Sequence, residues 1–296
     1  MRRFIDELDG QKRLWSWKRY RVVLGKLQDC FKVSLDWEEI DRDALVRFER
    51  YMVEELKNGP NTVRKELAML HRIYRMAIKD GIIGAEVDPF HRYDPPKSKQ
   101  TERIKLSMQE IGRLASANLK PGTWSALARD AWLISFYLGG MRFGDLACLK
   151  VGDLNKGRCT YRMNKTGQII TVPLPDPAKQ ILDRYLAGKE SKAFALPFLE
   201  PGDDDDPRYL RRRIGSKNAL CNRFIKVAAK CAELENADQI TMHISRHSFA
   251  DYARQKSGNL YAISKTLGHS SLQITQTYLK SFDQEAVDQL AEELWH

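Results

Sequence analysis

Residues 241–280 read TMHISRHSFADYARQKSGNLYAISKTLGHSSLQITQTYLK and bring several chemically active side chains into one short segment. They include the pair His243 and Arg246, then His269 after a Leu-Gly step, and finally Tyr278. A spacing of three places two helical side chains one turn apart on the same face, so His243 and Arg246 can reach one phosphate group. The segment therefore gathers candidate functional side chains, and His243 and Arg246 can act on the same bound group.

Two segments upstream of this region add cationic side chains. Residues 139–146 read GGMRFGDL and include Arg142. Two runs rich in strand-forming residues, 158–163 and 168–172, flank an Asn-Lys-Thr-Gly turn, which predicts an antiparallel hairpin with Lys165 near its tip. Arginine, lysine and histidine side chains thus precede the tyrosine along the chain.

These segments resemble the two signature boxes and the catalytic-lysine hairpin of the tyrosine recombinases, the phage integrase family. The order Arg, Lys, His-x-x-Arg, His, Tyr spans positions 142–278. Its six members make the resemblance specific, whereas a lone His-x-x-Arg arises by chance in any basic helix. The resemblance implies a site-specific DNA recombinase that cuts and rejoins DNA through a covalent 3′-phosphotyrosine formed by Tyr278.

The chemistry of transesterification explains why these residue types are needed. Extra negative charge develops on the nonbridging oxygens, and the guanidinium groups of Arg142 and Arg246 can hold such oxygens in bidentate fashion. The phenol of Tyr278, with a reference pKa of about 10, becomes a nucleophile once its proton is removed among clustered cations. The departing 5′ oxygen needs a proton, and we expect Lys165 to supply it as a general acid, with Lys156 as a second lysine nearby.

The resemblance also assigns the remaining site residues. It implies that His243 assists proton transfer, that His269 hydrogen-bonds the scissile phosphate, and that Asp145 orients the cationic residues. Three positions depart from the family pattern: Gly139 stands where Thr is frequent, Asp145 where Glu is frequent, and Lys280 where His is common. None of these departures removes a catalytic group, but the shorter carboxylate of Asp145 can shift the groups that it orients. Taken singly, each site residue also fits an ordinary salt bridge, turn or helix end.

Composition independently favours a nucleic-acid partner. The chain has 296 residues, enough for two domains, and its 49 Lys and Arg against 39 Asp and Glu give a net charge of +10 and a pI near 9.3. We therefore expect double-stranded DNA as the partner.

No apolar run reaches the roughly 18 residues of a membrane span, and acidic residues interrupt the amino terminus before a signal-peptide core. A cytoplasmic, nucleoid-associated protein without a membrane role is expected.

The sequence gives no sign of a cofactor. It contains no Gly-x-x-x-x-Gly-Lys phosphate loop, and a phosphotyrosine retains the energy of the broken bond, so we expect no ATP. The five cysteines form no Cys-x-x-Cys pair, which argues against a zinc site and a disulfide framework. The acidic run at 202–207 lacks the alternating ligands of a calcium loop and is expected to be a solvated loop. Arginines are expected to take the place of a metal ion.

Helical periodicity predicts a mainly α protein with two domains. Apolar residues recur at steps of three and four in stripes at residues 14–31, 45–56 and 63–77. They indicate a helical core-binding domain, SAM-like by the resemblance, over residues 1–85. A stretch with prolines and basic residues, 86–105, is expected to be a linker. The two domains would form a clamp around DNA.

Residues 106–296 are expected to form a mixed α+β catalytic domain that contains the small antiparallel hairpin. A capping box of Ser107 and Glu110 marks its first helix. Further helices are expected at 123–137, 176–187, 217–233, 243–256 and 259–267. An amphipathic helix is expected at the C-terminus, residues 283–295. The resemblance implies that it packs onto a neighbouring protomer, and packing into its own domain is the alternative.

We expect a dimer on one DNA site and a tetramer when two sites pair. Basic residues at 12–26 and 208–217 are candidate phosphate contacts. Within the recombinases, an integrase of a phage or mobile element and a Xer-type resolver of chromosome dimers are both open. A type IB topoisomerase-like nicking and sealing enzyme, and a catalytically silent DNA-binding accessory protein, are the alternatives from other classes.

Overall fold

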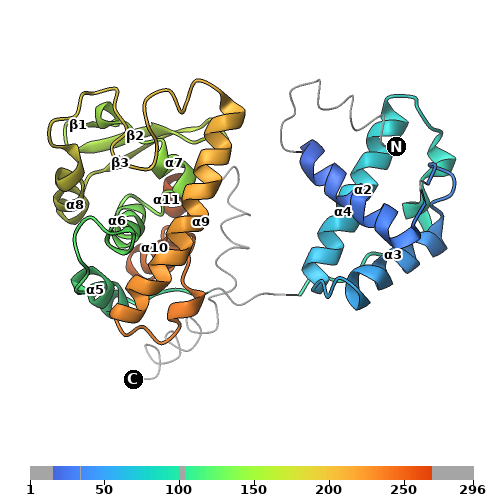
Figure 1. Ribbon diagram of the computed structural model, residues 1–296, viewed down its shortest axis with the longest axis horizontal. Helices are drawn as coiled ribbons and strands as arrows, with labels where there is room; N and C mark the ends of the chain where they lie inside the picture. Colours follow the sequence, from blue (N-terminus) through green and yellow to red (C-terminus); the bar gives the residue numbers. More distant parts are fainter. Residues whose placement is uncertain (1–15, 34, 100–103, 269–296) are drawn as a thin grey trace. The chain divides into compact units, whose positions relative to one another are not determined.

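The computed structural model describes residues 16–33, 35–99 and 104–268 of the chain, which divides into two compact units, Met1–Gln100 and Thr101–His296 (Figure 1). Each unit has its own apolar core. Within the described ranges, no helix has the length and apolar character needed to cross a membrane. The expected C-terminal helix at 283–295 lies outside the described residues.

The first unit is a helical bundle. Its helices are α2 (Ser16–Phe31), α3 (Arg42–Glu54) and α4 (Pro60–Lys79). Their apolar stripes meet in one core, where Phe48, Leu67 and Tyr74 are fully buried. Figure 1 shows α2 crossing α4, and the two helices are in contact. The three helices expected from the apolar stripes are therefore present.

Local capping explains where these helices begin. Asp41 precedes α3, and its carboxylate accepts a hydrogen bond of 2.8 Å from the Ala44 amide, as its position predicts. Helix α4 begins at Pro60, because proline's fixed φ and missing N–H suit the first turn. The Asn61 side chain in this turn bonds both the N–H and the C=O of Lys99.

Much of the segment expected as a linker folds onto the first unit. It contains two short 3-10 helices, η1 (Ala85–Val87) and η2 (Pro89–Arg92). Phe90 stacks on His71 with ring centroids 4.5 Å apart, and Tyr93 is buried in the same core with its hydroxyl bonded to Glu49. Aromatic rings of this size stabilise a fold when they are buried, so this part of the chain joins the bundle.

The second unit is built around α6 (Trp124–Tyr137), which is buried along most of its length. The other helices described here are α5 (Met108–Ser116), α7 (Phe143–Ala147), α8 (Asp176–Leu186), α9 (Pro207–Cys231), α10 (Ile244–Ser257) and α11 (Leu260–Leu267). Helices α5, α8, α9 and α10 all pack against α6, and α9 runs along one side of the unit (Figure 1). This packing makes one continuous core.

Two helix starts in the second unit show how caps act. Ser107 and Glu110 form the expected capping box before α5, with the Ser107 amide 2.8 Å from the Glu110 carboxylate. Helix α9 begins at Pro207 rather than at residue 217, because Asp206 caps it through the Arg208 amide and Pro207 fits its first turn. The arginine-rich segment after Pro207 is therefore helical.

A small antiparallel sheet completes the second unit. Its strands are β1 (Leu154–Asn155), β2 (Arg158–Arg162) and β3 (Ile169–Pro173), in the order β1-β2-β3. Thr160 pairs with Thr171 on the exposed face, while Tyr161 and Ile170 point into the core. The predicted hairpin is confirmed, and β1 is an addition to it. The protein is mainly α-helical, with a helical first domain and a mixed α+β second domain, as the sequence predicts.

Candidate active site

Arg142 projects from a tight turn between α6 and α7. Gly139 and Gly140 both have positive φ, 77° and 69°, which lets the chain reverse direction before Arg142 caps α7. A Cβ atom on Gly140 would lie 3.1 Å from the Cα of Arg246, and one on Gly139 would lie 2.4 Å from the Thr266 methyl group. The absent side chains therefore allow this turn to pack directly against α10 and α11.

Arg246 is buried and held by backbone carbonyls. Its side chain lies in the first turn of α10, and the residue is 3% exposed. One Nη atom donates to the carbonyl of Gly140 at 2.9 Å, and the other donates to the carbonyl of Leu267. These bonds join the turn before Arg142, the start of α10 and the end of α11. The guanidinium is thus fixed in position before any substrate arrives.

A pair of buried serines holds the same segments together. The Ser135 hydroxyl on α6 donates to the Met141 carbonyl at 2.6 Å and lies 2.6 Å from the Ser245 hydroxyl. Ser245 in turn donates to the Met242 carbonyl at 2.7 Å. Buried hydroxyls that are fully bonded fix the spacing of the elements that they join. The segments of Arg142 and Arg246 are therefore tied together through α6.

His243 is the N-cap residue of α10 and is exposed. The Arg246 amide donates to the His243 carbonyl at 3.2 Å, so the two residues lie one turn apart as the spacing predicts. The imidazole rings of His243 and His247 meet edge to face, with centroids 4.7 Å apart. The next three residues of α10 are buried, so His243 is the side chain that reaches solvent at the start of this helix.

Asp145 lies on α7 and is 4% exposed. Its Oδ1 atom accepts a hydrogen bond of 2.8 Å from the Asn164 amide, while Oδ2 is buried and has no hydrogen-bond partner among the described residues. Burial raises the pKa of the Asp145 carboxyl, and the Asn164 amide and the guanidinium groups of Arg142 and Arg246 act in the opposite direction. The carboxyl is thus electrostatically coupled to both arginines.

The hairpin brings Lys165 to the side of the sheet near Arg142. The thioether of Met163, at the end of β2, accepts from Arg142 Nη1 at 3.8 Å and from the Thr166 hydroxyl at 3.7 Å. Lys165 lies between Met163 and Thr166 on the exposed tip. Lys156 lies in the turn before β2, so the whole strand, roughly 17 Å at about 3.3 Å per residue, separates it from the Lys165 end. Of the two lysines, Lys165 is the one whose hairpin contacts Arg142.

His269 and Tyr278 lie outside the described residues. The described chain ends at Gly268, which caps α11 with a φ of 61°. A Cβ atom on Gly268 would lie 2.3 Å from the Met163 sulfur, so α11 ends beside the hairpin and the Arg142 contact. The residue that follows is His269. Arg142, Arg246 and the Lys165 hairpin are thus brought together with the chain segment that leads to the two remaining site residues.

Three contributors to this arrangement were not predicted from the sequence. Met163, Asn164 and Ser135 join the hairpin and α6 to the arginine segments through the contacts given above. The sequence predicted the hairpin, but side-chain contacts between segments far apart in the chain carry no periodic signal. Within the described residues, no group of three or more His, Cys, Asp or Glu residues could hold a metal ion.

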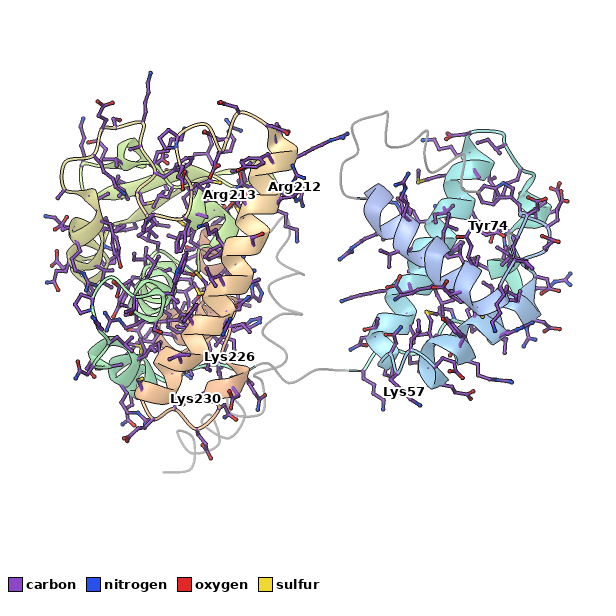
Figure 2. The ribbon with its side chains drawn as sticks, viewed as in Figure 1. Lys57, Tyr74, Arg212, Arg213, Lys226 and Lys230 are labelled. Carbon is purple, nitrogen blue, oxygen red and sulfur yellow. The ribbon has the colours of Figure 1, made fainter. Side chains whose placement is uncertain are left out.

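Helix α9 carries a basic exposed face. Figure 2 shows Arg212 near one end of the helix and Lys226 and Lys230 toward the other. Two basic residues of the helix are ion-paired: Arg213 Nε lies 3.2 Å from Asp203, and Lys230 Nζ lies 2.8 Å from Asp238. Arg212 is therefore a better candidate for a phosphate contact than Arg213. The basic face expected at 12–26 falls largely on residues whose side chains are not described.

The helical first unit, the sheet hairpin and the clustered arginine, lysine and histidine segments define the class of the tyrosine recombinases. The model of the phage integrase family matches residues 106–285, and that of the phage integrase SAM-like domain matches residues 1–94. These matches cover most of the sequence. The chain belongs to the phage integrase family.

Named relatives agree with this assignment. The chain is 26% identical over 264 residues to the tyrosine recombinase XerC of Roseiflexus sp. (strain RS-1), covering 88% of this chain and 81% of that protein. It is 27% identical over 289 residues to the tyrosine recombinase XerD of Xanthomonas campestris pv. campestris, covering 94% of this chain and 86% of that protein.

Solved structures share the fold. A lambda integrase dimer bound to a COC′ core site matches with a TM-score of 0.69 and 20% identity, covering 93% of this chain and 92% of that chain. The XerH site-specific recombinase bound to a palindromic difH substrate matches with a TM-score of 0.67 and 18% identity, covering 94% and 79% of the two chains. At this level of identity the likeness shows the fold.

Proposed function

We propose that this chain is a site-specific recombinase that cuts and rejoins double-stranded DNA through a 3′-phosphotyrosyl intermediate on Tyr278. The observation that carries the proposal is the buried guanidinium of Arg246, which is bonded to the turn that presents Arg142. A guanidinium fixed in this way, beside the turn that carries a second arginine, can form a preorganised cradle for a phosphodiester. The membership of the phage integrase family supports the same reaction.

In the proposed reaction, the phenolate oxygen of Tyr278 attacks the scissile phosphorus and the bond to the 5′ oxygen breaks. Arg142 and Arg246 hold the nonbridging oxygens as negative charge develops on them. Lys165 gives its proton to the departing 5′ oxygen, which leaves as a hydroxyl group. A 5′ hydroxyl from a second strand then attacks the phosphotyrosine and regenerates the tyrosine. One phosphodiester replaces another at each step, so no ATP is consumed.

The other site residues assist this exchange. His243 helps to move the tyrosine proton from the exposed start of α10, and His269 hydrogen-bonds the scissile phosphate. Asp145 orients the two arginines, since its carboxyl is coupled electrostatically to both of them. The attacking oxygen of Tyr278 and the departing 5′ oxygen are thus surrounded by cationic side chains. No metal ion is required in this scheme.

We further propose that both units of the protein contact DNA. The first unit is the DNA-binding module, extended beyond residue 85 because Tyr93 belongs to its core, and the second is the catalytic domain. The net charge of +10 and the basic face of α9 suit contacts to phosphates.

Lambda integrase has been solved as a dimer on a core site and as a tetramer on a Holliday junction. We infer a dimer on one site and a tetramer in synapsis, joined through the helix at 283–295, in a cytoplasmic protein associated with the nucleoid.

The alternatives predict different products from the same DNA. A plasmid carrying two copies of a candidate site from the gene's own neighbourhood distinguishes them. The recombinase excises the DNA between direct repeats, whereas a type IB topoisomerase-like enzyme relaxes a supercoiled plasmid that lacks the site. Excision circles that disappear in Tyr278→Phe support the proposal, and relaxation of any plasmid without excision contradicts it. An accessory protein would give neither product.

A further inference from the structure

We propose that Asn164 is a positioning residue that holds the tip of the β2–β3 hairpin against α7 and thereby sets where Lys165 delivers its proton. The inference rests on the proposed function, because it takes Lys165 as the general acid. Lys165 directly follows Asn164, and neighbouring Cα atoms are about 3.8 Å apart. Whatever fixes Asn164 therefore fixes the base of the lysine side chain.

Asn164 contacts α7 and its C-cap through both backbone and side chain. Its amide N–H donates to Asp145 Oδ1 at 2.8 Å. Its Nδ2 atom donates to the Gly144 carbonyl at 3.0 Å and lies 3.6 Å from the Cys148 sulfur. Asp145 and Gly144 belong to the short helix that Arg142 caps, and Cys148 is its C-cap residue. One asparagine thus joins the lysine hairpin to the element that positions the first arginine.

The other bonds of the tip lie within the hairpin itself: the Gly167 amide donates to the Met163 carbonyl at 2.8 Å, and Arg162 donates to the Gly167 carbonyl at 2.8 Å. Residues 164–167 are exposed, and Lys165 makes no ion pair with a described residue. A lysine side chain has a long flexible stem, so the position of its ammonium group depends on how firmly the backbone at Lys165 is held. The sulfur contact of Met163 with Arg142 is a weak hydrogen bond. The Asn164 contacts are the main polar link from the tip to α7 in the described residues.

The chemistry of the side chain matches this role. Nδ2 must donate to a carbonyl, and a carboxylate at this position would offer no donor and would stand beside Asp145. Cys148 is half-buried, and burial raises the pKa of its thiol, so it stays neutral and accepts only weakly. The bond from Nδ2 to the Gly144 carbonyl is therefore the stronger of the two. Removing the side chain leaves the backbone bond to Asp145 in place, so the hairpin remains paired but its tip loosens.

Cleavage of a substrate with a 5′-bridging sulfur tests the proposal, because a thiolate leaves without needing a proton. Single-turnover cleavage is measured on a nicked site with oxygen or sulfur at the bridging position. On the oxygen substrate we expect Asn164→Ala to cleave about tenfold more slowly than the wild type. On the sulfur substrate it should cleave at close to the wild-type rate, as should Lys165→Ala. Arg142→Ala should stay slow on both, because its loss affects the nonbridging oxygens.

Two further variants test whether the effect on cleavage is specific to the Asn164 side chain. Asn155→Ala, at the end of β1 in the same sheet, removes an exposed asparagine that has no bond to α7 among the described contacts and should cleave both substrates normally. Asn164→Ser retains a donor near the backbone and should cleave the oxygen substrate faster than Asn164→Ala. If Asn164→Ala melts at too low a temperature for the cleavage assay, Asn164→Ser is used in its place.

The outcomes separate this inference from the proposed function. If Lys165→Ala is rescued by sulfur and Asn164→Ala is not, Asn164 acts by some route other than the lysine and the inference is wrong. If the sulfur substrate does not rescue Lys165→Ala either, Lys165 is not the general acid, and the inference about Asn164 is wrong as well. Wild-type cleavage of the oxygen substrate by Asn164→Ala would also overturn it.

Discussion

Replacing Gly140 with alanine should destabilise the second unit and displace Arg246. The new Cβ atom would lie 3.1 Å from both Cα and Cγ of Arg246, in a backbone with a φ of 69°. The left-handed conformation costs an alanine about 1–2 kcal/mol, and overpacking adds about 1–3 kcal/mol. We therefore expect Gly140→Ala to lower the free energy of unfolding by about 2–5 kcal/mol.

Gly157→Ala is the matched control. Gly157 has a φ of 70°, almost the same conformation, but nothing lies within 4 Å of the position of its Cβ atom. This variant should lose only the backbone contribution of about 1–2 kcal/mol. The difference between the two variants isolates the contact between Gly140 and Arg246.

Urea denaturation of the full chain measures both variants, and DNA cleavage is then compared at a temperature where each is folded. Gly140→Ala should unfold at a lower urea concentration than Gly157→Ala. It should also cleave more slowly, because the new methyl group would push Arg246 away from the Gly140 carbonyl that it bonds. Equal unfolding midpoints for the two variants would refute the close packing of this turn on α10.

Three other outcomes are expected. Arg142→Ala should slow cleavage by about 10²–10³-fold with a small effect on DNA binding, whereas Arg158→Ala on the exposed sheet face should not; single-turnover rates and gel-shift affinities check this, and a large loss of binding with normal chemistry would contradict it. Arg213→Ala should lower the melting temperature because it breaks the pair with Asp203, while Arg212→Ala should leave melting unchanged and reduce the salt dependence of DNA binding; the reverse pattern in melting and titration experiments would contradict this. A thiol reagent at pH 8 should label Cys231 rapidly in the native protein and the two thiols of Cys159 and Cys221 slowly, since burial raises the pKa of both to about 12; fast labelling of those two, read by mass spectrometry, would disagree.

The elements that follow from local chemistry were predictable from the sequence. The capping box at Ser107, the cap at Asp41 and the buried periodicity of α6 each depend on residues within one or two turns. The hairpin around Lys165 was predictable because a turn sequence lies between two strand-like runs. The order of the site residues was visible for the same reason, since it is a property of the chain itself.

The features that were missed depend on contacts between distant segments. Phe90 and Tyr93 look like linker residues until the core formed by α3 and α4 is available to bury them. The early start of α9 was hidden because a run of arginines has no apolar stripe. The link from Asn164 to α7 joins residues about twenty positions apart, and no pattern in the sequence specifies it. Long-range side-chain bonds of this kind set the geometry of the site and are seen only in the fold.

The central claim is that Tyr278 forms a covalent bond with DNA. Wild-type protein and Tyr278→Phe are incubated with nicked half-site DNA from the gene's own neighbourhood and separated by denaturing electrophoresis, with binding checked on a native gel. We predict a protein–DNA adduct in the wild type, its absence in Tyr278→Phe, and nearly equal binding by both proteins. An adduct that persists in Tyr278→Phe would show that another residue is the nucleophile and would contradict the account.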